Sequence, residues 1–224
     1  ENFSFTLKYI KPGENLGFGR ANNLGVSESK YKNILLLNLD AQINVKISEI
    51  VSSIVNNGNS FIGALMFNDD GISVPSYGSF PNSISTIIMP SKMYSICEKD
   101  TAFEVDWIEA SFLAFNINEW DKVGGFDEEI FMYGEDLILG FDAKCKGIDV
   151  KIDPNLVYSH TGGYNDSKYG NIFKGILLYL KRMGTPYSFF LQVVLHLSMV
   201  FKMTVYSVLG LSKVKYRARV KSVF

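Results

Sequence analysis

Three polar stretches, far apart in the sequence, combine residue types that can carry metal or acid–base chemistry. The first comprises Asn38 and Asp40, directly after the apolar run Ile34–Leu37, which predicts a strand buried on both faces of a parallel sheet. Ligand-binding side chains of α/β sheets gather past the carboxyl ends of such strands. Asp40 offers a carboxylate and Asn38 a carbonyl oxygen. Mg²⁺ and Mn²⁺ prefer such oxygen ligands and also bind diphosphate oxygens. The stretch predicts either a metal site or a simple strand-end turn.

The second and third stretches supply a carboxylate pair and a histidine. Glu135 and Asp136 stand at the start of a helix predicted over residues 135–146, where the helix N-terminus stabilises carboxylates, so capping alone could explain them. His160 follows a short predicted strand, and a lone histidine is more often structural than a ligand. The functional interpretation depends on the order Asp40, Asp136, His160.

The elements that must position these residues alternate between strand and helix patterns. The 224 residues suffice for one α/β domain with an appendage. Apolar alternation and runs predict strands at 3–10, 33–39, 60–67, 103–115 and 149–152, and helical spacing predicts helices at 21–30, 45–56, 135–146 and 169–183. The Gly- and Asn-rich residues 11–23 and the stretch 68–90 are predicted to be loops. The pair Gly124 and Gly125 predicts a turn with unusual backbone angles.

Composition excludes several classes of protein. An apolar content of 47% and an aromatic content of 14% are too high for a disordered chain. The net charge of −1 provides no overall basic field for nucleic acid. Cys97 and Cys145 have no paired spacing, which argues against a disulfide framework or a zinc knuckle. This cysteine usage leads us to expect a reducing, cytoplasmic setting, and no signal peptide is visible in the first residues.

The last 40 residues have a different character. Residues 189–211 are apolar except for a polar stripe of Gln192, His196 and Lys202. The segment is long enough to span a bilayer, but the stripe favours a helix in the membrane plane or packed on protein. A basic cluster follows, comprising Lys213, Lys215, Arg217, Arg219 and Lys221, and such a cluster favours the anionic cytoplasmic leaflet. We expect a catalytic domain at 1–184 and a tail at 185–224 that contacts the inner face of the cell membrane through 189–221; packing on the domain or on a partner chain is the alternative.

Four stretches resemble motifs of bacterial family 2 glycosyltransferases, particularly their rhamnosyltransferase-like branch. Asn15–Gly25 resembles the stretch N-x-G-x-x-x-x-N-x-G, and Leu35–Asp40 resembles the L-L-N-P-D form of the Asp-any-Asp signature. Val123–Asp136 is similar to the block G-G-F-D-x-x-F-F-x-Y-x-E-D, and Pro154 with His160 is similar to the closing P…H segment. Each motif is weak, but their common order and spacing make the resemblance specific.

The resemblance implies a GT-A fold, a Rossmann-like mixed sheet flanked by helices, and an inverting reaction. A sugar would move from a UDP- or dTDP-linked donor to a saccharide acceptor, such as a lipid-linked saccharide in cell-surface polysaccharide assembly. Asp40 would bind the divalent metal, Mn²⁺ or Mg²⁺, with His160 as a further metal or diphosphate contact. Asp136 would be the general base on the acceptor hydroxyl, supported by Glu135.

The same resemblance implies the residues around the two substrates. The donor-binding set comprises Asn15, Gly17, Asn22, Asn23 and Asn38. The acceptor-binding set comprises Trp107, Ser111 and Tyr133. For Trp107, a place in the core is as reasonable as a platform for a sugar face.

The sequence departs from the family pattern at the helix that follows the carboxylate pair. The family has Glu-Asp-x-Asp-Leu and then Arg four residues after the second Asp, whereas this chain has Ile138 and Asp142. Family members also begin about 60 residues earlier, roughly two βα units. We therefore expect this chain to lack the first strands and not to turn over donor alone. A non-catalytic saccharide-binding or assembly subunit remains the alternative; a nucleotidyltransferase is disfavoured because no Gly-rich loop with a following basic cluster is found.

Overall fold

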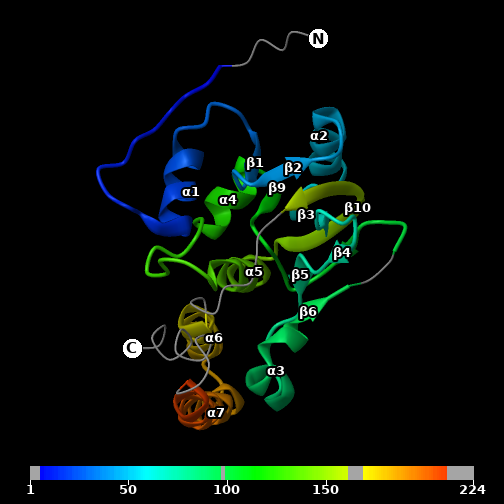
Figure 1. The fold of residues 1–224 in the computed structure, drawn as a ribbon. Helices are drawn as coiled ribbons and strands as arrows, with labels where there is room; N and C mark the ends of the chain where they lie inside the picture. Colours follow the sequence, from blue (N-terminus) through cyan, green and yellow to red (C-terminus); the bar gives the residue numbers. More distant parts are fainter. Residues whose placement is uncertain (1–5, 97–98, 161–168, 211–224) are drawn as a thin grey trace.

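A mixed β-sheet forms the centre of the protein in the computed structural model, which describes residues 6–96, 99–160 and 169–210 (Figure 1). The strand order is β1-β9-β3-β10-β2, with β4 beside β3 and β7 beside β10. These strands are β1 (Asn33–Leu37), β2 (Ala41–Ile43), β3 (Ser60–Phe67), β4 (Ser73–Val74), β7 (Phe103–Glu104), β9 (Phe112–Asn116) and β10 (Asp149–His160). A smaller sheet has the order β6-β5-β8, with β5 (Tyr77–Gly78), β6 (Tyr94–Ser95) and β8 (Trp107–Ile108).

Helices cover both faces of the large sheet. The helices of the described residues are α1 (Gly17–Ser27), α2 (Ile47–Asn56), α3 (Ile84–Ile88), α4 (Ile117–Val123), α5 (Glu135–Cys145), α6 (Tyr169–Met183) and α7 (Pro186–Gly210), with a 3₁₀ turn at Pro90–Met93. On one face α2 buries Ile50 and Ile54 against β3, β9 and β10. On the other face α1, α4 and α5 bury side chains such as Trp120 and Leu139 against the sheet. Strand β3 is buried on both sides, which explains its continuous apolar sequence.

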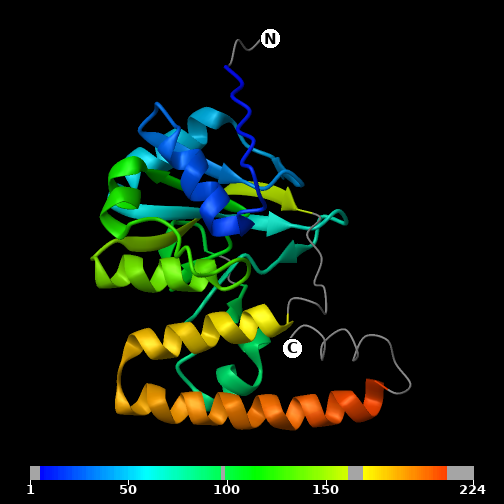
Figure 2. The ribbon, with the colours of Figure 1, turned by 90° about the vertical axis from the view of Figure 1, so that its left-hand side faces the viewer.

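Helices α5, α6 and α7 form a stack below the sheet (Figure 1). Ile138 on α5 packs in one apolar cluster with Leu180 on α6 and Leu195 on α7. Figure 2 shows α6 and α7 as two long helices that run side by side, with α3 next to them. Helix α7, which belongs to the predicted tail, therefore shares an apolar core with α5 and α6.

Several predicted elements differ from the structure. Residues 6–10 form no strand, and α1 begins at Gly17, inside the predicted loop. Strand β1 is antiparallel to β9 and alternates in burial, so the prediction of a parallel strand buried on both faces is wrong. Strand β10 continues past Pro154 to His160, because a register shift between Asp153 and Val157 accommodates the proline. The predictions for β3, α6 and the glycine turn are confirmed, the turn by φ angles of 94° and 76°.

Candidate active site

The first part of the site is a turn that brings Asp40 against His160. Strand β2 pairs antiparallel with β10, so that Ala41 lies opposite His160. The Nε2 atom of His160 lies 3.0 Å from Oδ1 of Asp40 and 3.4 Å from Nδ2 of Asn38. The His160 side chain is 10% exposed, whereas that of Asp40 is 60% exposed. The histidine is thus held by the protein, and the carboxylate is open to a ligand.

These donor atoms fit one side of a divalent metal site. A cation between Asp40 and His160 would take the place of the proton that their two facing atoms share. Within residues 6–96, 99–160 and 169–210, no group of three or more His, Cys, Asp or Glu side chains could hold a metal. The two residues therefore form a partial ligand set, suited to an ion that completes its shell with diphosphate oxygens and water.

The second part of the site is a group of three carboxylates around the start of α5. The backbone amide of Ala110 donates to Oδ1 of Asp136 over 3.2 Å. Glu135 is buried, and its Oε2 atom has no hydrogen-bond partner among the residues that the structure describes. Glu109 supplies the third charge close to Asp136. Sequence reasoning missed Glu109 as a site residue; its signal was the last acidic residue of the stretch 103–115, two positions after Trp107.

Burial raises the pKa of Asp136 and Glu135, and for Asp136 repulsion by neighbouring carboxylates adds to this effect. Burial raises the pKa of Asp136 well above its usual range, and the nearby charges of Glu135 and Glu109 raise it further, against a hydrogen bond from Ala110. Burial also raises the pKa of Glu135 to about 7, despite backbone hydrogen bonds at Glu135 and Tyr133. These effects raise the pKa values by more than the helix N-terminus, which favours ionised carboxylates, lowers them. The group therefore holds a proton acceptor whose basicity is unusually high for a carboxylate.

Residues 109–111 join the two parts of the site. The Ser111 hydroxyl lies 2.7 Å from the hydroxyl of Tyr158, and the Ser111 carbonyl accepts from the Asn38 amide over 3.0 Å. The ring of Tyr158 stacks on that of His160, two residues further along β10. Burial raises the pKa of Tyr158, so its hydroxyl stays a neutral hydrogen-bonding group. The three residues predicted from their order, Asp40, Asp136 and His160, are thus linked through one short segment.

The backbone before Glu135 turns sharply against α6. Tyr133 has a φ of 66° and Gly134 a φ of 107°, and a left-handed tyrosine is strained. A Cβ atom placed on Gly175 of α6 would lie 2.7 Å from the Cα of Gly134. We call the turn Tyr133–Asp136 the carboxylate corner. Gly134 and Gly175 allow α6 to contact this corner, backbone against backbone.

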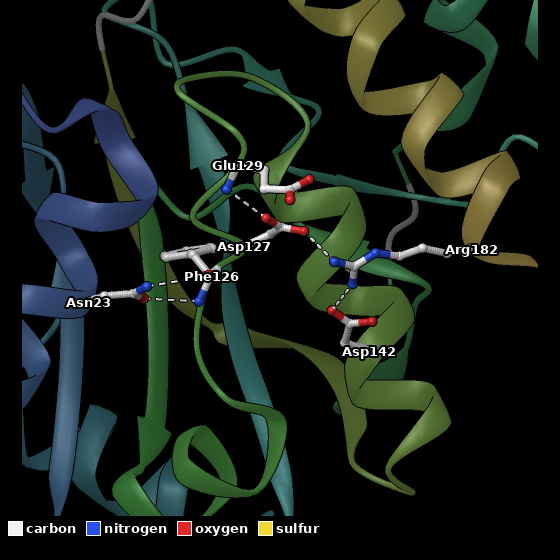
Figure 3. Close-up of polar contacts among 6 residues, drawn as sticks. All are labelled: Asn23, Phe126, Asp127, Glu129, Asp142 and Arg182. Atoms are coloured by element: carbon white, nitrogen blue, oxygen red, sulfur yellow. Dashed lines mark hydrogen bonds and ion pairs between the residues drawn. The ribbon is translucent and has the colours of Figure 1, made fainter.

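A second contact from α6 explains the unusual residues on α5. Arg182 pairs with both Asp127 and Asp142, as Figure 3 shows, and the side chain of Asp127 is only 8% exposed. The arginine therefore comes from α6 instead of from α5 itself. Ile138, where the family pattern has an acid, is fully buried beneath α6 and α7.

Most of the predicted donor-binding residues make contacts that hold α1 in place. The side chain of Asn23 donates to the Phe126 carbonyl and accepts from the Phe126 amide, each over 2.9 Å (Figure 3). The side chain of Asn15 accepts from the Gly17 amide over 3.0 Å. The side chain of Asn22 donates to the carbonyl of Phe18, one helical turn earlier. Gly17 itself lies against the backbone of Phe131. Their role in donor binding stays a prediction.

The predicted acceptor-binding residues differ in accessibility. Trp107 is 4% exposed, and its indole N–H donates to the Ser79 carbonyl over 3.1 Å, so the ring occupies the core and offers no face to a sugar. Ser111 is also buried, beneath the site. Tyr133 is half-buried at the corner. Of the three, Tyr133 is the least buried, and its role in acceptor binding stays a prediction.

A separate cleft of about 590 Å³ lies between α1 and α4. Its lining includes Arg20, Asn23, Trp120 and Glu128, but none of Asp40, Asp136 and His160. The candidate site is therefore distinct from this hollow.

Comparison with known proteins identifies the fold. No family model matches the chain. A structure of GalNAc-T7 with UDP, GalNAc and Mn²⁺ has a TM-score of 0.56 and 13% identity, and the match covers 80% of this chain and 40% of that one. The fold is therefore that of the GT-A glycosyltransferases, as predicted.

Two curated relatives are more specific. The chain is 26% identical over 180 residues to the rhamnosyltransferase WbbL of Escherichia coli K12, covering 73% of this chain and 67% of that protein. It is 25% identical over 154 residues to the low-salt glycan biosynthesis hexosyltransferase Agl10 of Haloferax volcanii, covering 64% of this chain and 48% of that protein. The chain thus spans about half to two thirds of these relatives. The resemblance to the family 2 glycosyltransferases is confirmed.

Proposed function

We propose that this chain forms the reaction centre of an inverting glycosyltransferase that moves a sugar from a nucleotide-diphosphate donor to a saccharide acceptor. The observation that carries the proposal is the link between the carboxylate group at Asp136 and the Asp40–His160 pair through residues 109–111. Glycosyl transfer needs a base at the acceptor and charge neutralisation at the departing diphosphate. The two parts of the site match these two needs.

Each residue has a defined task in the proposed reaction. Asp136, in its ionised form, accepts the proton of the acceptor hydroxyl as that oxygen attacks the anomeric carbon. Glu135 and Glu109 raise the pKa of Asp136 and so increase its basicity. Asp40 and His160 would hold Mn²⁺ or Mg²⁺, with Asn38 nearby, and the ion would supply charge neutralisation at the diphosphate.

The relatives and the sequence support a choice of donor and acceptor. The GT-A neighbour contains UDP, a sugar and Mn²⁺, which supports a UDP- or dTDP-linked hexose or deoxyhexose as donor. The relatives act in glycan biosynthesis or rhamnosyl transfer by name, which supports a polysaccharide acceptor. A lipid-linked acceptor would place the protein at the cytoplasmic face of the membrane, with contact through residues 189–221.

Donor binding provides the first test. Thermal unfolding is measured with UDP- and dTDP-sugars in the presence and absence of Mn²⁺, because a ligand that binds only the native state raises the unfolding temperature. We expect a metal-dependent rise for the unsubstituted protein and none for Asp40→Ala. Asp70→Ala, at an exposed position in the turn between β3 and β4, is the control and keeps the rise. A rise that does not depend on the metal would contradict the role of Asp40.

The stereochemical outcome provides the second test. A protein that includes the N-terminal strands implied by the family resemblance is supplied with donor and a saccharide acceptor, and NMR of the product reports the configuration of the new anomeric centre. Inversion relative to the donor supports a single displacement with Asp136 as base. Retention would overturn the proposed reaction, and saccharide binding without metal-dependent donor binding would favour the non-catalytic alternative.

A further inference from the structure

One side of the long helix α7 packs on the protein. The buried side chains Leu191, Leu195 and Met199 lie on this side. Lys202 donates to the Ile88 carbonyl at the end of α3, and the His196 ring meets that of Phe173 on α6 edge to face, 5.7 Å between centroids. The predicted polar stripe is therefore largely used in contacts within the protein.

The opposite side of α7 is apolar and exposed. It carries five large side chains that are each at least 64% exposed, namely Phe189, Leu197, Val200, Phe201 and Val208. Ile84, Ile88 and Met89, in and just after the neighbouring α3, are also exposed. We call these eight residues the α7 face. The side of a helix that faces water normally carries polar residues, and large apolar side chains exposed together on one side mark an interaction site.

The packing of α7 determines whether this helix can span a membrane or lie in the plane of its interface. Residues Pro186–Leu209 are long and apolar enough to cross a bilayer, with a mean hydropathy of 1.5 in the most apolar window. However, α7 packs along α6 and against α3. Because α6 carries the exposed charges Lys181 and Arg182, a spanning α7 would have to separate from α6 or carry these charges into the hydrocarbon. A position in the plane of the interface buries the α7 face and leaves the stack intact.

The distribution of charge along the chain distinguishes between possible partners of the α7 face. Residues 169–224 contain nine of the 22 basic residues of the chain and none of its 23 acidic residues. The remainder of the chain is therefore strongly acidic. A second copy of the chain would bring two basic segments together, whereas an anionic lipid surface complements them.

We propose that the α7 face docks in the plane of an anionic membrane surface. The stack in Figure 1 then places the carboxylate corner at the start of α5, two helix layers above the lipid. This docking does not depend on the transfer reaction. If the proposed function holds, the docked orientation keeps the site close to lipid-linked saccharides.

Vesicle binding without donor or acceptor tests the proposal. The full 224-residue chain is sedimented with phosphatidylcholine vesicles that contain or lack phosphatidylglycerol. We expect binding to the anionic vesicles and a loss of about tenfold or more in the triple variant Leu197→Ser, Val200→Ser, Phe201→Ser, since each loses most of a large apolar side chain at the interface.

A matched control has the same number of apolar-to-serine changes at exposed positions elsewhere. Ile47→Ser, Val55→Ser and Ile72→Ser, on α2 and in the turn after β3, retain full binding. Thermal unfolding of both variants confirms that they fold. Equal loss of binding in the control would overturn the assignment of the face.

Two further results would overturn the proposal. Failure of the unsubstituted chain to bind anionic vesicles, combined with a dimer in light scattering that the triple variant abolishes, would assign the face to a second copy. Resistance of the bound chain to alkaline carbonate would show a spanning helix, whereas extraction supports the in-plane position. None of these results depends on glycosyl transfer, so failure here leaves the proposed reaction standing.

Discussion

Asp136 combines a position at a helix N-terminus with a pKa that is raised instead of lowered. The reason is the neighbourhood of Glu135 and Glu109, because three carboxylates in a poorly solvated site cannot all ionise easily. Such an arrangement reduces native-state stability, and perturbed pKa values of this kind gather at functional sites. At the scale of single residues, the structure therefore favours chemistry over capping for this pair.

Asp136→Asn is the most direct test of the base. Asparagine keeps the shape and can still accept from the Ala110 amide, but it cannot take up a proton. We expect transfer to fall by about 10²–10⁴-fold, the usual contribution of a general base. The measurement uses a protein that includes the N-terminal strands implied by the family resemblance and follows release of nucleoside diphosphate in the presence of acceptor. Asp121→Asn, on the exposed side of α4, is the control. Unchanged turnover in Asp136→Asn would exclude the assignment.

Glu135→Gln should increase the stability of the protein at neutral pH. The native pKa of Glu135, about 7, lies above the value of 4.5 for an unfolded chain, so between these values the native state binds more protons than the unfolded state. Stability from this group is thus present below about pH 4.5 and is lost as the pH rises through 7. Removal of the charge should raise the free energy of unfolding by about 1 kcal/mol or more at pH 8.

Thermal unfolding at pH 4.5 and pH 8 checks the sign of this effect. The difference between Glu135→Gln and the unsubstituted protein should be small at the lower pH and larger at the higher pH. Glu128→Gln, an exposed change in the loop before α5, should show no such trend. A stabilisation independent of pH would mean that packing, and not ionisation, is responsible.

At the scale of elements, α6 positions the carboxylate corner. It touches Gly134 through Gly175, pairs with Asp127 and Asp142 through Arg182, and covers Ile138. The departures at Ile138 and Asp142 are therefore consistent with each other, since an apolar residue and an acid on α5 match the apolar side and the arginine of α6. They need not indicate loss of activity.

Gly175→Ala should disturb the corner. The new Cβ would lie 2.7 Å from the Cα of Gly134, and backbone atoms cannot move aside cheaply. We expect a loss of about 1–3 kcal/mol in the free energy of unfolding, together with reduced transfer. Gly25→Ala on α1 is the matched control, because no atom lies within 4 Å of its Cβ position, and there alanine should be neutral or stabilising. Equal effects in the two variants would contradict a special role for the contact between α5 and α6.

Arg182→Met should destabilise the protein because it leaves the carboxylate of Asp127 without its partner in a poorly solvated position. The arginine is about one third exposed, so we expect a loss of about 1–2 kcal/mol in chemical denaturation. Adding Asp127→Asn to this variant should recover part of the loss. Lys181→Met, an exposed neighbour on α6, is the control. If the double variant loses more free energy of unfolding than the two single variants lose together, the ion pair is not the source of the stabilisation.

At the scale of the whole molecule, the tail is part of the structure below the sheet. The cluster of α5, α6 and α7 buries Ile176, Tyr179 and Leu180 together with Leu191 and Leu195. The boundary predicted at 184/185 therefore separates two helices that pack against each other. The same helix that completes this core presents its other side to the outside.

Removal of α7 tests whether the tail is independent. A chain that ends at Gly184 exposes the apolar side of α6, so we expect a lower unfolding temperature and a tendency to aggregate. A chain that ends at Gly210 keeps α7 and removes only the last 14 residues, which makes it the appropriate control. An unchanged unfolding temperature in the shorter chain would support an independent appendage. Differential scanning fluorimetry and light scattering provide the two readouts.

By itself, the sequence determined the elements whose patterns are local. The apolar run of β3 and the helical spacing of α6 were placed correctly because each depends only on neighbouring residues. The glycine turn and the order Asp40, Asp136, His160 were visible for the same reason, together with the resemblance to a known family.

Only the tertiary structure decided which of these residues meet. The antiparallel pairing of β1, the burial of Trp107 and the contact of Asn23 with Phe126 join positions far apart in the chain. Neither Glu109 as a neighbour of Asp136 nor Arg182 as the partner of Asp142 follows from any local pattern. The reason is physical: sequence periodicity encodes which side of an element is apolar, whereas pairing, burial and pKa depend on the atoms that folding brings to that side.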